Sequence, residues 1–590
     1  MSDLDRRLPG VSEATVRWIH AALTLERLAF VDRALAGTLL RLGAPRDSTS
    51  ADVLALGTVL ASSAPREGHT LFDLGSEQEP FPPLPLPPSL PPRREWEGLL
   101  SSIPSVVGRP EAPAPLVVEG GGLYLYRYWR AEVRVARLLA DRLAGEGEEG
   151  VGEGASRERL LEEIFPEAGG ASRAAALAAL GSRLLVLTGG PGTGKTWTAA
   201  RLLLLFRRLV PGIRVVSAAP TGKAAARMGE ALAEVLPPEL AVPSMTLHRL
   251  LGASLRGIAP RRGEVLPWDL VLLDELSMVD LLLMESLLSA LSPRTRLVLV
   301  GDQDQLSPVG AGAVMGDLCR ALSAQEKGGP RGLVVLSRNY RQRESSLLQE
   351  FSRKVAEGDG EGALRLFERG DPDLVFAPVA EGWPENLLVE GFSPLATASS
   401  DREALERLGR FMALSPFRDG PMGALRGSRH LERVFSRLRG SRGFRAPAMI
   451  LQNSYDTGLM NGDLGVLSGE RLVFAAPGRP EPAILPLRMA PPWETAFVMT
   501  VHKSQGSEFD RVCLLLGGSS TPCSRAAFSI PRPPGRRKAL SSGPLPRASS
   551  PWSASLRPAL PASKAGFPAT SPLPARNREK GPGAALLLLP

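Results

Sequence analysis

Residues 184–206 read LLVLTGGPGTGKTWTAARLLLLF, and this stretch decides the fold. An apolar run predicts a buried strand, a glycine-rich turn follows it, and the residues after the turn have the apolar spacing of a helix. The turn fits the pattern G-x-x-x-x-G-K-[ST]. Glycines let backbone N–H groups close on phosphate oxygens, and the helix N-terminus attracts their negative charge. The predicted phosphate-binding loop consists of Gly189, Gly190, Pro191, Gly192, Thr193, Gly194, Lys195 and Thr196.

A second motif supplies carboxylates. Residues 269–275, DLVLLDE, form an apolar run that ends in Asp274 and Glu275. In enzymes with these two motifs the lysine, here Lys195, reaches the β and γ phosphates, while Thr196 and Asp274 are suited to hold Mg²⁺. Glu275 is suited to act as the base that positions the attacking water. The sequence therefore predicts hydrolysis of a nucleoside triphosphate with Mg²⁺.

The region around these motifs alternates apolar runs with helical patterns. Runs that are apolar throughout are typical of strands buried on both faces, and such strands need crossover helices between them. We therefore expect an α/β domain with a parallel sheet over residues 166–365. Its expected strands are residues 183–189, 214–220, 269–275, 296–303 and 333–339.

The rest of the chain divides into three further regions. Residues 1–165 are expected to form a mostly helical domain, with a hairpin and an amphipathic helix at 115–143 and a stiff proline-rich linker at 80–94. Residues 366–516 begin with helical patterns and then become rich in β patterns. Residues 517–590 are rich in Pro, Ser and Arg and are expected to be disordered.

Composition bounds the class of protein. No signal peptide follows the polar start MSDLDRRLPG, and no apolar run reaches the roughly eighteen residues of a membrane span. Three cysteines without paired spacing argue against a disulfide framework and a cysteine metal site. We therefore expect a cytoplasmic protein. The net charge of +8 lies in residues 517–590, where eleven Lys and Arg accompany the single acid Glu579, so the folded domains must bind any nucleic acid through local patches.

Five further motifs occur in order around the loop and the acidic pair. Together the motifs resemble superfamily 1 helicases, and more closely the RecD family, the α chains of RecBCD (exonuclease V) complexes. Two segments favour RecD over other helicases, LYLYRYWRAE at 123–132 and NSYDTGLMNGDLGVL at 453–467. The five motifs are AAPTGKAAARM (218–228), TLHRLLG (246–252), GDQDQLSPVGAGAVMGDL (301–318), LSRNYRQ (336–342) and MTVHKSQGSEFD (499–510).

The resemblance implies a fold and a machine. We expect two RecA-like domains with parallel sheets, ATP between them, and single-stranded DNA across their tops. A small SH3-like β insertion is implied at about 444–494. Movement along the strand would be 5′→3′. RecB-like and RecC-like chains would complete a heterotrimer, with residues 1–165 as the partner-binding domain. Any nuclease activity would lie in a partner chain, since the sequence offers no acidic cluster for strand cleavage beyond Asp274 and Glu275.

The resemblance also implies roles for individual residues. Gln305 would sense the γ-phosphate, and Arg341 would act as an arginine finger. Gly506 and Glu508 would lie near the nucleotide cleft. His248 is expected to be structural, because TLHRLL is typical of a packed helix. The expected contacts with the DNA backbone are Pro220, Thr221, Lys223, Thr500, His502, Lys503 and Gln505.

Two features depart from the family. RecD-like chains carry a glutamine that recognises adenine a short distance before the phosphate loop, whereas this chain has Ser172 near that position. The preference for ATP over GTP therefore stays open. In addition, the last helicase motif, similar to Leu-Tyr-Thr-Ala-x-Thr-Arg-Ala, does not follow Leu516.

The missing motif has an explanation in the genetic code. Codons read one frame over from Phe528 allow Leu-Tyr-Thr-Ala-Ala-Thr-Arg-Ala. We therefore expect that one base is missing or skipped between about Leu516 and Thr521, and that residues 517–590 are translated out of frame. A genuine disordered basic tail is the alternative.

Three functions remain open from the sequence. The first is an ATP-driven DNA helicase subunit that acts in double-strand break repair and recombination. The second is a catalytically impaired structural subunit of the same complex, and the third is a stand-alone RecD-like helicase. DNA-stimulated ATP hydrolysis separates the first from the second, and capture of large partner chains separates the first from the third.

Overall fold

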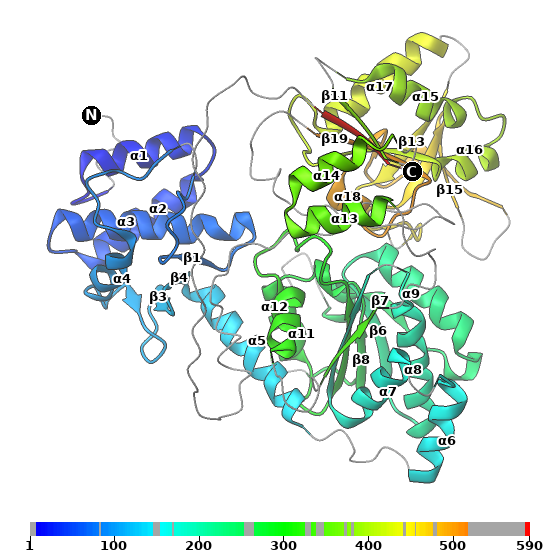
Figure 1. The fold of residues 1–590 in the computed structure, drawn as a ribbon, viewed down its shortest axis with the longest axis horizontal. Coiled ribbons are helices and arrows are strands. Elements are labelled where there is room, and N and C mark those ends of the chain that lie inside the picture. Colours follow the sequence, from blue (N-terminus) through cyan, green and yellow to red (C-terminus); the bar gives the residue numbers. More distant parts are fainter. Residues whose placement is uncertain are drawn as a thin grey trace.

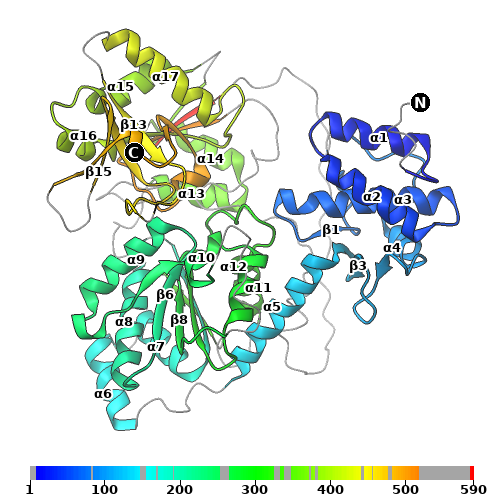
Figure 2. The same ribbon diagram turned by 180° about the vertical axis from the view of Figure 1, so that it is seen from behind.

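The computed structural model describes residues 8–81, 84–145, 154–167, 170–190, 192–252, 265–324, 332–337, 347–370, 374–378, 383–439, 444–454, 456–475, 481–516 and 585–589. Three bodies follow one another along the chain, an N-terminal domain and two α/β bodies that face each other (Figures 1 and 2). Among the described helices, none is both long and apolar enough to cross a membrane.

The N-terminal domain is built around helix α3, which is buried on nearly every side. A helix that is apolar all round needs neighbours on all faces, and α1, α2, α4 and a small sheet of order β1-β4-β3-β2 supply them. The helices of this domain are α1 (Glu13–Thr24), α2 (Phe30–Gly43), α3 (Ser48–Ser63), the 3₁₀ turn η2 (Ala64–Glu67) and α4 (Arg93–Ser101). Its strands are β1 (Leu71–Asp73), β2 (Val107–Gly108), β3 (Leu116–Glu119) and β4 (Gly122–Leu125).

The proline-rich segment differs from the expected stiff linker, because its described residues pack on this domain. The Phe81 ring stacks on Trp18 with 5.7 Å between ring centroids. Trp18 Nε1 donates to the Pro85 carbonyl oxygen at 2.8 Å, and Trp96 Nε1 donates to the Pro91 carbonyl oxygen at 3.0 Å. Apolar residues between the prolines give the segment a face to bury, and the tryptophans satisfy carbonyls that an extended proline chain leaves unpaired.

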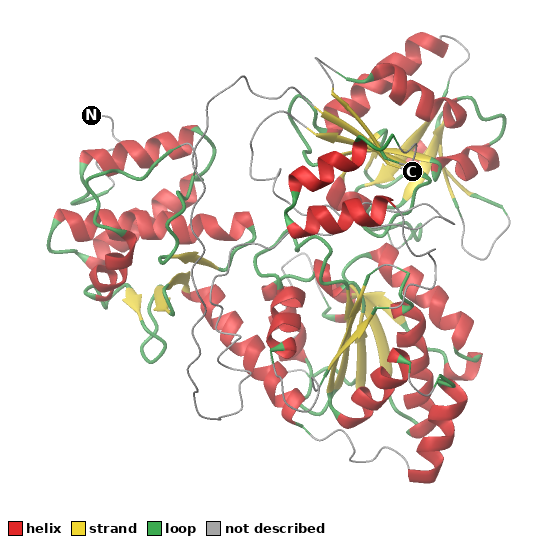
Figure 3. Cartoon of the chain, in the orientation of Figure 1, coloured by secondary structure: helices red, strands yellow, loops and turns green. Residues whose placement is uncertain are grey.

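The first α/β body confirms the expected parallel sheet. Within the described residues its six strands run in the order β10-β5-β9-β8-β6-β7, all parallel, with helices on both faces (Figure 3). Its strands are β5 (Leu184–Gly189), β6 (Val215–Ala219), β7 (Ser244–Thr246), β8 (Leu270–Leu273), β9 (Arg296–Gly301) and β10 (Leu333–Leu336). Its helices are α5 (Tyr126–Ala144), α6 (Gly154–Ile164), α7 (Ala171–Gly181), α8 (Lys195–Leu209), α9 (Gly222–Val235), η3 (Pro238–Leu240), α10 (Leu247–Leu250), η4 (Leu276–Met278), α11 (Leu281–Ala290) and α12 (Val314–Ser323).

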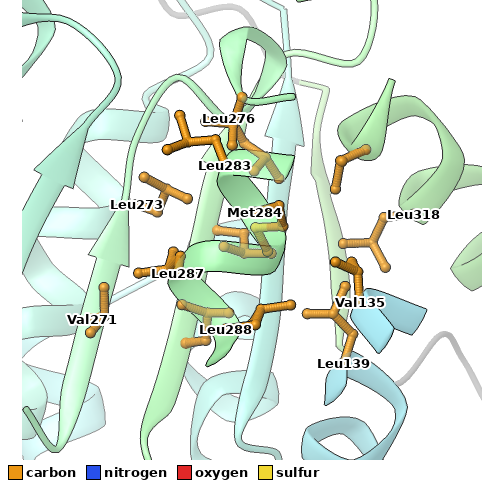
Figure 4. Packing of buried hydrophobic residues seen from close by; sticks show 14 of the residues in the cluster. Val135, Leu139, Val271, Leu273, Leu276, Leu283, Met284, Leu287, Leu288 and Leu318 are labelled. Atoms are coloured by element: carbon orange, nitrogen blue, oxygen red, sulfur yellow. The ribbon is translucent and has the colours of Figure 1, made fainter. Parts of the chain in front are cut away.

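Helix α5 packs in the core of this body, although it precedes the expected boundary at residue 165. Val135 and Leu139 lie in one buried cluster with Leu287 of α11 (Figure 4). Their spacing of four residues places them on one face of the helix. The first α/β body therefore begins at Tyr126, and the hairpin β3–β4 connects it to the N-terminal domain.

The second α/β body has its own sheet and core. Its order is β11-β20-β19-β12-β18, with β12 parallel to both β18 and β19. Helices α13 and α14 belong here, because Phe351 and Leu366 lie in its buried cluster, which differs from the expected boundary at 365. The strands are β11 (Val375–Pro378), β12 (Phe411–Ser415), β18 (Val498–Thr500), β19 (Arg511–Leu516) and β20 (Ala585–Leu589). The helices are α13 (Leu347–Glu357), α14 (Gly360–Phe367), α15 (Glu385–Ala396), α16 (Asp401–Leu408), α17 (Ala424–Arg439) and α18 (Val501–Ser504).

Strand β20 corrects one expectation for the tail. Residues 585–589 pair antiparallel with β19 on one side and with β11 on the other. The expectation of disorder therefore does not hold for these five residues. Four consecutive leucines in them have the character of a strand inside a sheet. The remainder of the tail, 517–584 and Pro590, lies outside the described residues.

An insertion in the second body forms a separate antiparallel sheet. Its order is β16-β15-β14-β13-β17. These strands occupy the range expected for the insertion, and an SH3-like identity stays a prediction. The elements are β13 (Arg445–Ile450), β14 (Leu464–Ser468), β15 (Arg471–Phe474), β16 (Ala483–Pro486), η6 (Leu487–Met489) and β17 (Trp493–Thr495).

Candidate nucleotide and DNA sites

The phosphate-binding loop connects β5 to α8 in the first body. Gly192 and Gly194 have φ angles of 80° and 82°, in the left-handed region that glycine adopts without strain. A side chain at Gly189 would bring its Cβ to 2.4 Å from the carbonyl oxygen of Leu336 on β10. Glycine is therefore required where the loop leaves the sheet. Pro191 lies outside the described residues.

Lys195, the first residue of α8, lies over this loop. Its Nζ donates to the carbonyl oxygens of Gly189 and Gly190, the latter at 3.0 Å, and is 4.0 Å from Asp302 Oδ2. Thr196 follows in the first turn of the helix. An ammonium held at a glycine-rich loop and a helix N-terminus suits a triphosphate, so the residues present fit ATP.

The acidic pair follows β8, beside the loop. Glu275 has a φ of 52°, and its backbone N–H donates to Asp274 Oδ1 at 2.9 Å. Burial raises the pKa of Asp274. Burial, and then the neighbouring Asp274 carboxylate, raise the pKa of Glu275 to about 7. A carboxylate with a pKa near neutrality is suited to accept a proton from water.

Asp302 is a site residue that the sequence analysis did not identify. It is 3% exposed at the end of β9, and Gln305 Nε2 donates to its Oδ2 at 3.4 Å. Gln305 Oε1 accepts from Ser277 Oγ, also at 3.4 Å. Asp302 therefore connects the expected γ-phosphate sensor to Lys195. In the sequence, Asp302 could have been recognised as the first acidic residue of GDQDQ, directly after a strand that neighbours β5.

The expected Mg²⁺ ligands are few. No group of three or more His, Cys, Asp and Glu side chains in the described parts of the chain could hold a metal ion. Mg²⁺ at nucleotide sites usually takes one or two protein oxygens and completes its shell with phosphates and water. The hydroxyl of Thr196 and the carboxylate of Asp274 fit that role. Arg341 lies outside the described residues.

Gly506 and Glu508, expected at the nucleotide cleft, contact helix α9 of the first body. Arg227 Nη1 donates to the Gly506 carbonyl oxygen at 2.7 Å, and its Nη2 is 3.6 Å from Glu508 Oε1. One turn earlier, Lys223 Nζ donates to Ser507 Oγ at 2.7 Å. Residues 506–508 and α9 thus form a direct connection between the two bodies, which we call the α9 interface.

Lys223 is therefore held in the α9 interface, whereas the sequence predicts it at the DNA backbone. Burial lowers its pKa to about 8. The neighbouring Gly222 approaches the second body so closely that an added Cβ would lie 2.3 Å from Met460 Cγ. Thr221 caps the helix, accepting from the Ala224 backbone N–H at 3.2 Å.

A cavity of about 640 Å³ lies between the bodies and takes residues from both. Four of the expected DNA contacts line it, Pro220 and Thr221 from the first body and His502 and Gln505 from the second. Burial lowers the pKa of His502. The other lining residues are Arg127, His248, Met278, Asp280, Leu282, Leu283, Ser286, Ser307, Pro308, Val309 and Gly310.

Three expectations do not match this cavity. His248 is exposed and lines it, so the structural role expected for it is wrong; α10 is a single turn that buries Leu247 and Leu250 only. Thr500 and Lys503 are not in the lining. Lys503 Nζ pairs with Glu494 Oε1 at 2.9 Å, and Thr500 Oγ1 accepts from the Lys503 backbone N–H at 3.4 Å.

Comparison with known proteins identifies the family. Residues 168–371 match the family described as AAA domain. A RecBCD enzyme subunit RecD from Mycolicibacterium smegmatis is 36% identical over 496 residues, which cover 78% of this chain and 84% of that protein. The chain belongs to the RecD family of DNA helicases. The RecD resemblance expected from the motifs is thus confirmed.

Other relatives agree with RecD membership. An ATP-dependent RecD2 DNA helicase from Deinococcus radiodurans is 32% identical over 425 residues, covering 68% of this chain and 52% of that protein. A solved Pif1 helicase from Candida albicans has a TM-score of 0.32 and 16% identity, covering 61% of this chain and 88% of that chain, a likeness too low to add to the assignment.

Ser172 lies near the position where the sequence analysis expected an adenine-recognising glutamine. It shares a hydrogen bond of 2.9 Å with Thr198 on α8.

Proposed function

We propose that this RecD chain is the ATP-dependent 5′→3′ DNA helicase subunit of a RecBCD-like complex that acts in double-strand break repair and recombination. The observation that carries this proposal is the cavity between the bodies. It takes Thr221 from the end of β6 and His502 and Gln505 from the segment after β18, so one strand in it would contact both α/β bodies.

The proposed hydrolysis uses the residues of the first body. Lys195 would bind the β and γ phosphates, and Gln305, oriented by Asp302 and Ser277, would contact the γ-phosphate. Glu275 would accept the proton of the attacking water. Mg²⁺, bound through Thr196 and Asp274, would neutralise developing charge on the phosphates.

The proposed coupling between hydrolysis and movement uses the α9 interface. Thr221 at the start of α9 lines the cavity, while Arg227 one and a half turns later contacts Gly506 and Glu508. A change of the nucleotide in the cleft would alter these contacts and the cavity together. Alternating grips on the strand by the two bodies would then move the chain along DNA.

Partners and location belong to the same proposal. RecB-like and RecC-like chains would bind this RecD chain in a heterotrimer, with the N-terminal domain as the binding part, and the complex would act in the cytoplasm. Capture of the tagged chain from its own host should recover two large partner chains. Recovery of none would favour a stand-alone RecD-like helicase.

DNA-stimulated ATP hydrolysis tests the proposed function directly. We expect oligo-dT to stimulate hydrolysis, and Lys195→Ala to abolish it, because the β and γ phosphates lose their cation. Arg17→Ala is the matched control, since Arg17 is 71% exposed on the N-terminal domain and should leave the rate unchanged.

The alternative is a catalytically impaired structural subunit. The observation that favours it is the missing last motif after Leu516. An arginine finger contributes roughly 10³–10⁵ to the rate, so its loss could silence the chain. A chain that binds ATP and its partners but shows no stimulation by DNA would support this alternative against the helicase.

A further inference from the structure

The segment LYLYRYWRAE, residues 123–132, forms the end of strand β4 and the beginning of helix α5. Strand β4 ends at Leu125 and helix α5 begins at Tyr126. The Tyr126 ring stacks on Trp129 with 5.9 Å between centroids, and Trp129 Nε1 donates to Glu119 Oε2 at 2.7 Å. The first turn of α5 is therefore fixed to the hairpin that precedes it.

Arg127, the second residue of this turn, is exposed and lines the cavity between the bodies. The lining contains this one arginine and no lysine, as far as the described residues show. Arginine keeps its charge at all physiological pH values and offers several donors to phosphate oxygens. The acid in the lining, Asp280, caps α11 by accepting from the Leu283 backbone N–H at 2.8 Å.

The rest of α5 holds Arg127 in position. Arg130 and Arg134, further along the helix, lie 3.8 Å and 3.7 Å from Glu285 Oε1 on α11. Val135 and Leu139 of α5 lie in one buried cluster with Leu287 of the same helix α11 (Figure 4). Arg127 therefore projects from a helix that is already packed. Binding of a ligand would order only the side chain of Arg127 and not the helix.

Two further observations concern the surroundings of the cavity. The backbone N–H of Gly312, two residues after the lining loop 307–310, donates to the Gly68 carbonyl oxygen of the N-terminal domain at 3.0 Å. On the opposite side, Gln505 Nε2 is buried and has no hydrogen-bond partner within the described structure. A buried amide without a partner in a cavity wall indicates a polar ligand.

We propose that Arg127 binds a backbone phosphate of the single strand in the cavity, so that the segment before the ATPase sheet forms one wall of the DNA site. This inference rests on the proposed function, because it assumes that the cavity takes DNA. Phosphate contacts of this kind position a strand without reading its sequence. The contact would extend the DNA site to a residue outside the helicase motifs.

The experiment measures binding of fluorescent oligo-dT to the full chain by anisotropy over a range of salt concentrations. We expect Arg127→Gln to weaken binding about tenfold at low salt, as for loss of one charge-assisted hydrogen bond. The slope of log affinity against log salt should fall by about 0.7, the value for one phosphate contact on a single strand. Arg137→Gln, an exposed arginine of the same helix outside the cavity lining, should match the wild type.

Three outcomes separate this inference from the proposed function. A wild-type chain that binds no oligo-dT overturns both. A wild-type chain that binds, with Arg127→Gln and Arg137→Gln indistinguishable from it, overturns this inference and leaves the proposed function standing. If Arg127→Gln proves unstable, Arg127→Lys and Arg127→Met decide together. Lys keeps the charge and should keep the wild-type salt slope, whereas Met removes the charge and should lower the slope by about 0.7. Equal slopes for Arg127→Met and the wild type contradict the phosphate contact.

Discussion

At the scale of single residues, tertiary contacts changed the role that the sequence suggests. Lys223 belongs to a motif that resembles a DNA-gripping segment, yet its ammonium lies in the α9 interface on Ser507. His248 shows the reverse change, from an expected core residue to a cavity wall. Each residue is the second residue of a helix, Lys223 of α9 and His248 of α10, where side chains at neighbouring positions point in different directions.

Lys223 gives a prediction about pH. Burial lowers its pKa from 10.5 to about 8, so between these values the unfolded chain binds a proton that the folded chain does not. Stability should therefore rise with pH from about 8 to about 10.5, by roughly 3 kcal/mol at most. Thermal unfolding of the wild type and Lys223→Met at several pH values measures this contribution. A rise of equal size in both proteins would contradict it.

At the scale of elements, α9 and α5 each serve two parts of the molecule. Helix α9 begins at the cavity and contacts residues 506–508, and α5 begins at the cavity and ends in the core of the first body. The sequence predicts α5 as an amphipathic helix after a hairpin, and it predicts crossover helices such as α9 between the strands of the parallel sheet. The sequence does not predict the contacts of α9 with residues 506–508 or of α5 with the cavity. An apolar face predicts which side of a helix is buried, but it does not predict the partners of the polar residues.

The α9 interface gives a prediction about catalysis. Arg227→Gln removes the guanidinium group that contacts Gly506 and Glu508. We expect kcat of DNA-stimulated hydrolysis to fall roughly tenfold with KM for ATP little changed, because one charge-assisted contact that closes the cleft is lost. Arg214→Gln is the control, since it breaks an exposed ion pair with Asp269 in the same body. Equal rates for the two variants would refute a coupling role.

At the scale of the whole molecule, the sheets of the two α/β bodies are assembled differently. The first sheet is parallel throughout, with helices on both faces. The second includes β20, a five-residue strand near the end of a tail whose composition is unlike that of the rest of the chain. This strand pairs antiparallel with β11 on one side and with β19 on the other.

The tail gives a prediction for the full chain. A gene corrected by one base between the codons for Leu516 and Thr521 should encode the last helicase motif in place of the present tail. We expect DNA-stimulated ATP hydrolysis by that protein to exceed hydrolysis by the present chain by up to ~10³, the lower range for an arginine finger. Sequencing of the locus and assays of both proteins check this. Equal rates would show that the motif is dispensable here.

The sequence by itself determined the strand–loop–helix around Lys195, the acidic pair, the parallel sheet and the RecD family. Glycine spacing, apolar runs and short motifs encode these features locally, within a few turns or one strand. Only the tertiary structure decided that Arg127 and His248 join a cavity with His502, and that the proline-rich segment packs on tryptophans. Such contacts join residues far apart in the chain, and packing of the folded bodies selects them from many alternatives that the local pattern permits equally.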